Sequence, residues 1–202
     1  MGDTRNEWSY AGWSLIIIYT SPFTKGHQLY IYDTFTYADH YTDIDPTGKT
    51  SGPGGVVSGF LVPQPIPGEL YAANMTAFVG EGDWCYSDDF LAFNAPARYW
   101  NNASEIPDNN PSRLWDGLNL PDHNNTQAHP DNVWNSHAKS GFNDGVDIKT
   151  FYITWLSGLL HPGDTSARID LPTGIDVWNL VYMIFSFRSA TTTGGNLYFL
   201  IK

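Results

Sequence analysis

The stretch GWSLIIIYTSPF, residues 12–23, places an unbroken apolar run near the start of a polar, acidic chain. From Leu15 to Tyr19 the run carries no charge and does not alternate with polar residues. It is too short to span a bilayer, which needs about 20 apolar residues. Its three isoleucines and the Ser21-Pro22 stop favour a strand over a helix. We therefore predict a central strand over Trp13–Thr20 that is buried on both faces.

Eight further stretches have the length and composition of strands, and many end at Gly or Pro. No window of about 11 residues combines helical periodicity with freedom from Gly, Pro and β-branched residues. About nine short strands predict an all-β fold, a β-sandwich of the jelly-roll or Ig-like kind, in one domain over residues 1–202. We expect 178–187 to be a second central strand. The eight candidates are 28–37, 55–62, 70–79, 90–93, 147–155, 166–171, 178–188 and 197–202.

A long polar segment, residues 94–143, interrupts this pattern as a loop insertion rich in Asn, Asp and Pro. A structureless loop of this length is unusual inside a compact domain. Trp100, Trp115 and Trp134 are spaced through it. They either pin the loop onto the sheets as buried anchors, or stand exposed as stacking platforms for sugars.

Composition restricts the partners and the location. The chain has 21 acidic and 10 basic residues among 202, a formal net charge of −11, so it repels phosphate backbones and anionic membranes. One cysteine, Cys85, excludes an intrachain disulfide. Asp3 and Glu7 precede the apolar run, which is not the pattern of a signal peptide. We expect a piece of a longer exported protein, with a surface rich in Asn and Thr.

Acidic residues gather in DHYTDIDPTG, residues 39–48, where Asp39, Asp43 and Asp45 precede Gly48. Oxygens at alternate positions followed by a glycine turn match the first half of a calcium loop. Counted from Asp43, the twelfth position of such a loop should hold an acidic residue, but Gly54 stands there. The segment is therefore either a calcium site completed from elsewhere or a solvated acidic turn.

Catalytic patterns are weak. Glu81 with Asp83 or Asp88 is the one carboxylate pair that could cleave glycosidic bonds, although carboxylates in Gly-rich turns are usually solvated. The six histidines show no zinc-ligand spacing, and acids near Cys85 would raise the pKa of its thiol. We expect no enzyme activity.

Three N-x-[ST] sequons are candidate glycosylation sites: Asn74, Asn102 and Asn124. Asn102 and Asn124 fall in the long loop, which could accept a glycan. Asn74 lies inside a predicted strand, so a glycan there requires an outward-facing side chain.

The start GWSLIIIYTSP…LYIYDTF and the later stretch NDGVDIKTFYITWLSGLLHPGDTSARIDLPTGIDVWNLVYMIFSF together resemble a domain of unknown function in large archaeal and bacterial cell-surface proteins. Such proteins often carry Ig-like β repeats beside it. The resemblance covers residues 12–35 and 143–187 and implies an extracellular address and an all-β architecture. The family has no established activity to transfer.

We therefore expect a non-catalytic structural or adhesive module of a cell-surface protein, envelope layer or filament, whose partners are neighbouring domains or subunits. The alternative is a calcium-dependent carbohydrate-binding module that recognises glycans, and a glycan-cleaving enzyme is the third possibility. Nucleic acid and direct membrane insertion are not expected.

Overall fold

The structure is a computed structural model that describes residues 14–19, 27–39, 54–80, 89–100, 103–107, 109–114, 133–134, 146–173, 177–188 and 197–201. Strands dominate it, and the all-β prediction is confirmed. In the described ranges the helical elements are three short 3-10 turns, and no helix is long and apolar enough to cross a membrane. The turns are η1 (Ala97–Tyr99), η2 (Ala103–Glu105) and η3 (Trp155–Ser157).

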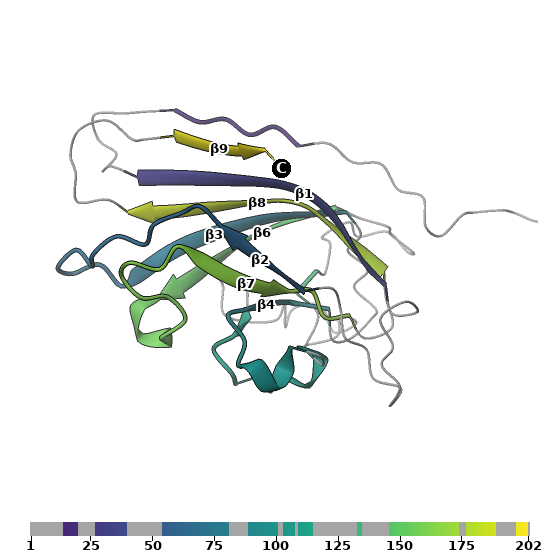
Figure 1. The fold of residues 1–202 in the computed structure, drawn as a ribbon. Coiled ribbons are helices and arrows are strands. Elements are labelled where there is room, and N and C mark those ends of the chain that lie inside the picture. The colour runs from purple at the N-terminus through teal and green to yellow at the C-terminus, as the bar shows by residue number, and fades with distance from the viewer. Residues whose placement is uncertain are drawn as a thin grey trace, which may run out of the picture.

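The larger sheet has five strands in the order β6-β3-β8-β1-β9 (Figure 1). Neighbouring strands are antiparallel, except that β9 runs parallel to β1. β8 lies in the middle of this sheet, so the prediction of a central strand over 178–187 is confirmed. The strands are β1 (His27–Asp39), β3 (Tyr71–Gly80), β6 (Val146–Thr154), β8 (Val177–Arg188) and β9 (Leu197–Ile201).

The smaller sheet has four strands in the order β2-β7-β4-β5 and lies beneath the larger one in Figure 1. Its β5 has only two residues and is the one strand of this sheet that the sequence did not predict, because two residues cannot show a period. The strands are β2 (Gly54–Ser58), β4 (Leu91–Phe93), β5 (Arg113–Leu114) and β7 (Ser166–Asp170).

One hydrophobic cluster takes side chains from both sheets. Phe185 of β8 is fully buried within it. The centroid of its ring lies 5.7 Å from that of Phe60, 5.8 Å from that of Phe93 and 5.8 Å from that of Tyr32. Phe60 follows β2 and Phe93 belongs to β4, so this one side chain connects the larger sheet to the smaller one.

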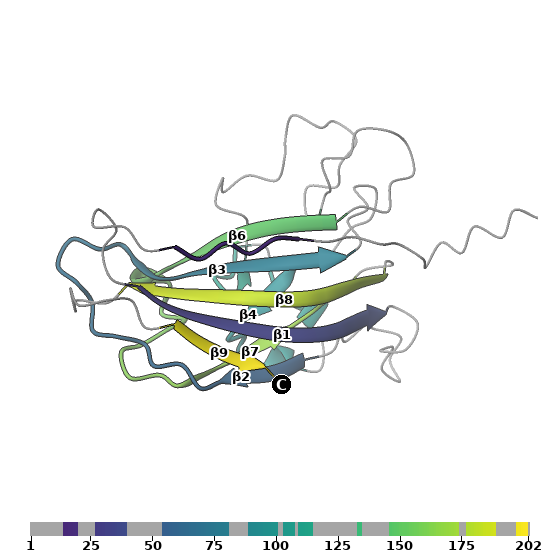
Figure 2. The ribbon, with the colours of Figure 1, turned by 90° about the horizontal axis from the view of Figure 1, so that it is seen from above.

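The prediction of a buried central strand over Trp13–Thr20 is wrong. Ser14–Tyr19 joins neither sheet. Its side chains are exposed in alternation: Leu15, Ile17 and Tyr19 by 73%, 72% and 75%, and Ile16 and Ile18 by 37% and 38%. Figures 1 and 2 show it over the face of the five-stranded sheet that points away from the smaller sheet, near β3 and β6. The hydrophobic effect favours covering such a run. Because the effect is non-directional, it does not specify which part of this chain, or which other molecule, provides the cover.

Asn94 joins the start of the long polar segment to the smaller sheet. Its φ of 46° is left-handed, a conformation that Asn tolerates better than most residues. Its side-chain oxygen accepts a hydrogen bond from the Arg168 N–H at 2.7 Å, and its Nδ2 donates to the Leu159 carbonyl at 2.7 Å. The same residue thus turns the chain and ties it to β7.

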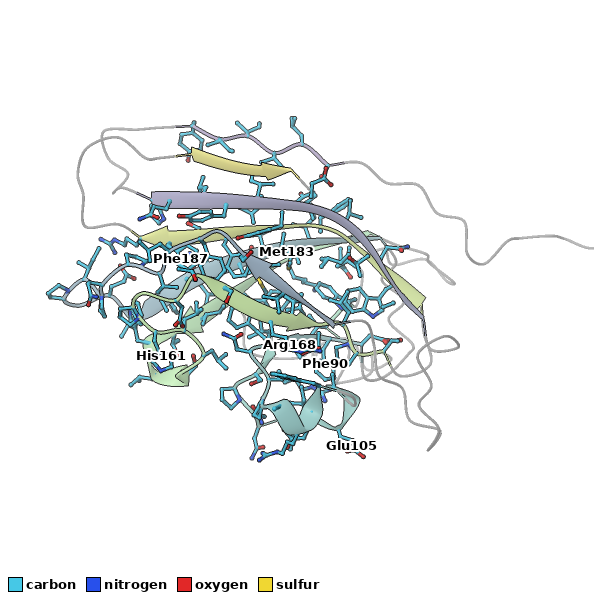
Figure 3. All side chains as sticks on the ribbon, in the orientation of Figure 1. Phe90, Glu105, His161, Arg168, Met183 and Phe187 are labelled. Atoms are coloured by element: carbon cyan, nitrogen blue, oxygen red, sulfur yellow. The ribbon has the colours of Figure 1, made fainter. Side chains whose placement is uncertain are left out.

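A buried ion pair lies on β7. Asp170 is fully buried, and its carboxylate accepts hydrogen bonds from Arg168 Nε at 3.0 Å and Nη2 at 2.5 Å. Burial raises the pKa of Asp170, whereas the hydrogen bonds and charge of Arg168 lower it. The Arg168 side chain also lies over the Trp100 ring, 4.8 Å from its centroid. These contacts hold the 94–100 region against the smaller sheet, on which Figure 3 labels Arg168.

Candidate functional site

The side of the five-stranded sheet that faces away from the core is largely uncharged. On β1, β3, β6 and β8, residues of the core cluster alternate with residues that face the other way. Phe78 supports this assignment, because it lies outside the core cluster and its ring stacks on Tyr182 at 5.2 Å. We call this surface the outer face. Register places on it Leu29, Ile31, Asp33, Asn74, Thr76, Phe78, Ile148, Thr150, Tyr152, Tyr182, Ile184 and Ser186.

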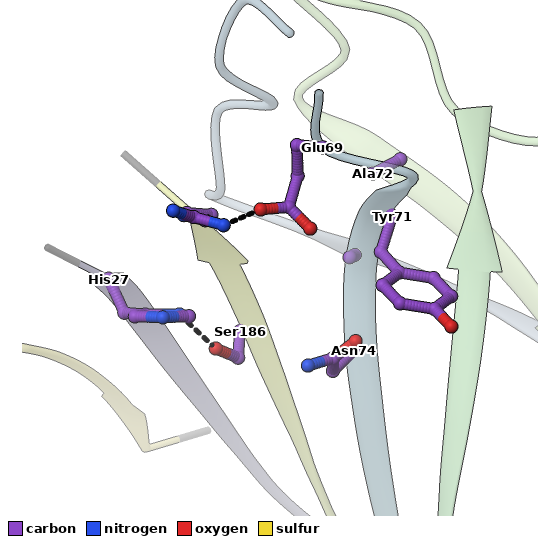
Figure 4. A pocket seen from close by; sticks show the side chains of 8 residues that line it. His27, Glu69, Tyr71, Ala72, Asn74 and Ser186 are labelled. Atoms are coloured by element: carbon purple, nitrogen blue, oxygen red, sulfur yellow. Dashed lines mark hydrogen bonds and ion pairs between the residues drawn. The ribbon is translucent and has the colours of Figure 1, made fainter. Parts of the chain in front are cut away.

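A pocket of about 370 Å³ opens at one end of the outer face (Figure 4). Three antiparallel strands bring its residues together, because β1 begins where β8 ends and β3 begins beside them. His27 comes from β1, and Ser186 and Arg188 come from β8. Glu69 and the start of β3 supply the opposite wall, with Tyr71, Ala72, Ala73 and Asn74.

A β-bulge shapes this wall. Tyr71 pairs with Thr154 and Ala73 with Ile153, so Ala72 is an extra residue in β3. A bulge re-aims the neighbouring side chains. Here it places Tyr71 on the outer face, where its ring lies 5.1 Å from that of Tyr152 at an angle of 45°. Both tyrosines are exposed, so an aromatic pair stands beside the pocket.

The polar groups of the pocket are partly engaged with one another. His27 Nδ1 and Ser186 Oγ share a hydrogen bond of 2.9 Å, and Arg188 forms an ion pair with Glu69. Three buried atoms, Glu69 Oε2, Asn74 Oδ1 and Arg188 Nε, have no hydrogen-bond partner among the residues that the structure describes, and of these Glu69 Oε2 lies in the ion pair. Burial, followed by the positive charge of Arg188, lowers the pKa of His27. The pocket is therefore polar but close to neutral in net charge at neutral pH.

A serine beside a histidine raises the question of nucleophilic catalysis. A catalytic serine needs a histidine base that a third group orients. The one carboxylate lining this pocket belongs to Glu69, which is paired with Arg188. Among the described residues, Ser186 and His27 therefore form a hydrogen-bonded pair, and the Glu69 carboxylate pairs with Arg188 instead of orienting His27.

We predict that His27 makes the stability of the fold depend on pH. Because its pKa is lowered from 6.5 in the folded chain, the unfolded chain binds the proton more readily, and stability is lost as the pH falls below 6.5. His27→Gln should flatten the slope of melting temperature against pH in that window. Equal slopes for the wild type and His27→Gln would contradict this prediction.

The predicted calcium ligands lie almost entirely outside the described residues. Asp39 ends β1, where its backbone pairs with Val177, and Asp43 and Asp45 fall in an undescribed range. In the described part of the chain, no three His, Cys, Asp or Glu side chains gather to hold a metal. The calcium site stays a prediction. The carboxylate pair of Glu81 with Asp83 or Asp88 is likewise outside the described residues.

The three loop tryptophans have different environments. Trp134 is 1% exposed and packs on Trp178 at 5.2 Å and Phe151 at 5.8 Å, so its ring is not a sugar platform, which corrects that assignment. Trp100 is 47% exposed, its Nε1 donates to the Ala95 carbonyl at 2.8 Å, and Arg168 lies over its ring. Trp115 lies outside the described residues.

Of the three sequons, only Asn74 is described, because Asn102 and Asn124 fall in undescribed ranges. Asn74 lies on the outer face, opposite Ser186 and Tyr152, and lines the pocket. A glycan on Asn74 would therefore start inside the pocket. Whether any of the three carries one stays a prediction.

Sequence reasoning did not identify the pocket, apart from Asn74. The alternation of 70–79 could have placed Asn74 and Thr76 on one face, but the bulge at Ala72 leaves no mark in the sequence. Comparison with known proteins gives no match to a protein-family model, a curated protein or a solved structure. The site is therefore interpreted from its own chemistry.

Proposed function

We propose that this chain is a non-catalytic structural or adhesive module of an extracellular surface assembly, built as a β-sandwich of the jelly-roll or Ig-like kind. The observation that carries the proposal is the exposed apolar segment Leu15–Tyr19. The resemblance to cell-surface domains and the Asn- and Thr-rich composition support the extracellular address.

Five adjacent apolar side chains that are each at least 37% exposed are costly in water. Burying one such side chain fully stabilises a protein by about 1.5–3 kcal/mol. The alternating exposure of Leu15–Tyr19 is that of an extended strand with two unlike faces, since Ile16 and Ile18 are half-covered and the other three are not. The segment has the shape and chemistry of a strand that is completed by a partner.

The larger sheet offers a place for such a strand. β6 lies at the end of the sheet and pairs with β3 on one side, so among the described strands its other edge is open. Ile148 and Tyr152 of β6 are exposed by 56% and 44%. An extended segment adds to such an edge through main-chain hydrogen bonds, and alternate side chains supply specificity.

The partner we propose is a second copy of this chain. One molecule presents both an unpaired apolar strand and an open edge, so two or more copies can satisfy each other. A net charge of −11 makes copies repel unless they meet through uncharged surface, and neither Leu15–Tyr19 nor the exposed side of β6 carries a charge. This arrangement suits a filament or an envelope layer.

Association should depend on Ile17. We expect wild-type chain to self-associate at high concentration, whereas Ile17→Asp should be monomeric, because the new carboxylate would be buried without a partner in the assembly. Its melting temperature as a monomer should stay unchanged, since Ile17 is already 72% exposed. Sedimentation velocity measures the mass and circular dichroism the melting.

The matched control is Leu156→Asp, because Leu156 is 95% exposed on η3 and belongs to neither surface. This variant should associate like the wild type. A wild-type chain that stays monomeric at high concentration, or an Ile17→Asp variant that associates equally well, would exclude this mode of assembly.

A further inference from the structure

We infer that the pocket between His27, Asn74 and Arg188 binds a neutral sugar residue of a glycan, with the Tyr71–Tyr152 pair as its stacking surface. The inference goes beyond the association proposed above and does not rest on it. It assigns a ligand class to a site formed by side chains other than the three loop tryptophans.

The charges of the pocket favour a neutral ligand. Arg188 and Glu69 face each other as an ion pair, with side chains that are 24% and 16% exposed. An anionic ligand drawn to Arg188 would meet the Glu69 carboxylate, and a cationic ligand drawn to Glu69 would meet the guanidinium. His27 adds no charge at neutral pH. A ligand that carries hydroxyl groups rather than charge avoids both conflicts.

The unpaired polar atoms suit hydroxyl groups. Asn74 Oδ1 can only accept a hydrogen bond and Arg188 Nε can only donate one, and both are buried without a partner among the described residues. Buried polar groups normally have partners, so a donor and an acceptor left unpaired in one pocket indicate a missing partner. A sugar hydroxyl both donates and accepts, and neighbouring hydroxyls on one ring can serve the two atoms together.

The aromatic pair suits the other surface of a sugar. A pyranose ring presents C–H groups on its faces, and these pack on aromatic rings, while its hydroxyls project at the edge. Tyr71 and Tyr152 are exposed by 39% and 44% and adjoin the polar groups. A cleft that combines aromatic side chains with a few convergent polar groups is typical of small-molecule sites. The bulge at Ala72, which turns Tyr71 outward, is typical of bulges beside functional sites.

Binding can be measured by saturation-transfer NMR and titration. The probes are the methyl α- and β-glycosides of glucose, galactose, mannose, N-acetylglucosamine and N-acetylgalactosamine, with methyl glucuronide and methyl glucosaminide as charged comparators. We expect at least one neutral glycoside to bind and to bind more tightly than either charged one. Tyr71→Ala should weaken its binding about tenfold through lost stacking, and Tyr71→Phe should retain it.

The matched control is Tyr19→Ala, which removes a tyrosine of the Leu15–Tyr19 segment that is 75% exposed and should leave sugar binding intact. Asn74→Ala should weaken binding with the fold retained, as its melting curve will verify. The titration is repeated on Ile17→Asp, so that sugar binding and self-association are judged separately. The inference is overturned if no neutral glycoside binds, if a charged one binds best, or if Tyr71→Ala and Tyr19→Ala bind alike.

Discussion

Phe185→Ala is expected to lower the free energy of unfolding by about 3–5 kcal/mol, the range for removing a buried phenylalanine ring. Phe185 is 0% exposed, and its ring contacts come from both sheets: Phe60, Phe93 and Tyr32. Because these neighbours lie on separate segments, Phe60 after β2, Phe93 on β4 and Tyr32 on β1, they cannot all move inward to fill the space. The remaining cavity should add to the lost hydrophobic burial.

Urea unfolding measured by intrinsic fluorescence gives this free energy. The matched control is Ile184→Ala on the same strand, since Ile184 faces outward and is only partly buried. It should cost clearly less than Phe185→Ala. Equal losses for the two variants would mean that β8 does not face the core as described.

Gly54→Ala is expected to destabilise the fold by about 3 kcal/mol or more, the cost of disrupting a buried ion pair. A Cβ at position 54 would overlap with Asp170 Oδ1 and Arg168 Nη2, the two atoms that join across the pair. Gly54 lies opposite Asp170 in the β2–β7 register, which fixes this approach. The buried carboxylate would have to leave its guanidinium or the strands would have to separate.

The adjacent glycine provides the control. A Cβ on Gly55 meets nothing within 4 Å, so Gly55→Ala should change stability by no more than about 0.5 kcal/mol. Thermal melting of both variants by circular dichroism makes the comparison. If Gly54→Ala melts at the same temperature as Gly55→Ala, the ion pair does not lie against β2.

Alternation predicted the sheets well because it reports directly on which residues face a core. It located β1, β3, β6 and β8, each with one apolar and one mixed face, to within a few residues. The prediction for Trp13–Thr20 rested on an unbroken apolar run, and it failed because such a run shows that cover is needed but not whether the same chain supplies it. It also could not place β9 parallel to β1, since strand direction is a property of the topology and not of the period.

The candidate site was less accessible to sequence reasoning. His27 and Ser186 belong to no sequence motif, and Asn74 was noted only as a glycosylation sequon. The three residues meet only because β1, β3 and β8 are neighbours in one sheet. Neither the Arg188–Glu69 pair nor the bulge at Ala72 has a sequence signature. The loop tryptophans were conspicuous for their size, but size does not distinguish a buried ring such as Trp134 from an exposed one.

The central position of β8 has a consequence for how the chain acquires its structure. β8 hydrogen-bonds to both β1 and β3, so the middle of the larger sheet cannot close until the residues up to Arg188 have been synthesised. Pairings between such distant parts of a chain form slowly, because a long loop must be closed first. A polypeptide emerging from the ribosome would therefore stay without its main sheet until the residues up to Arg188 have emerged.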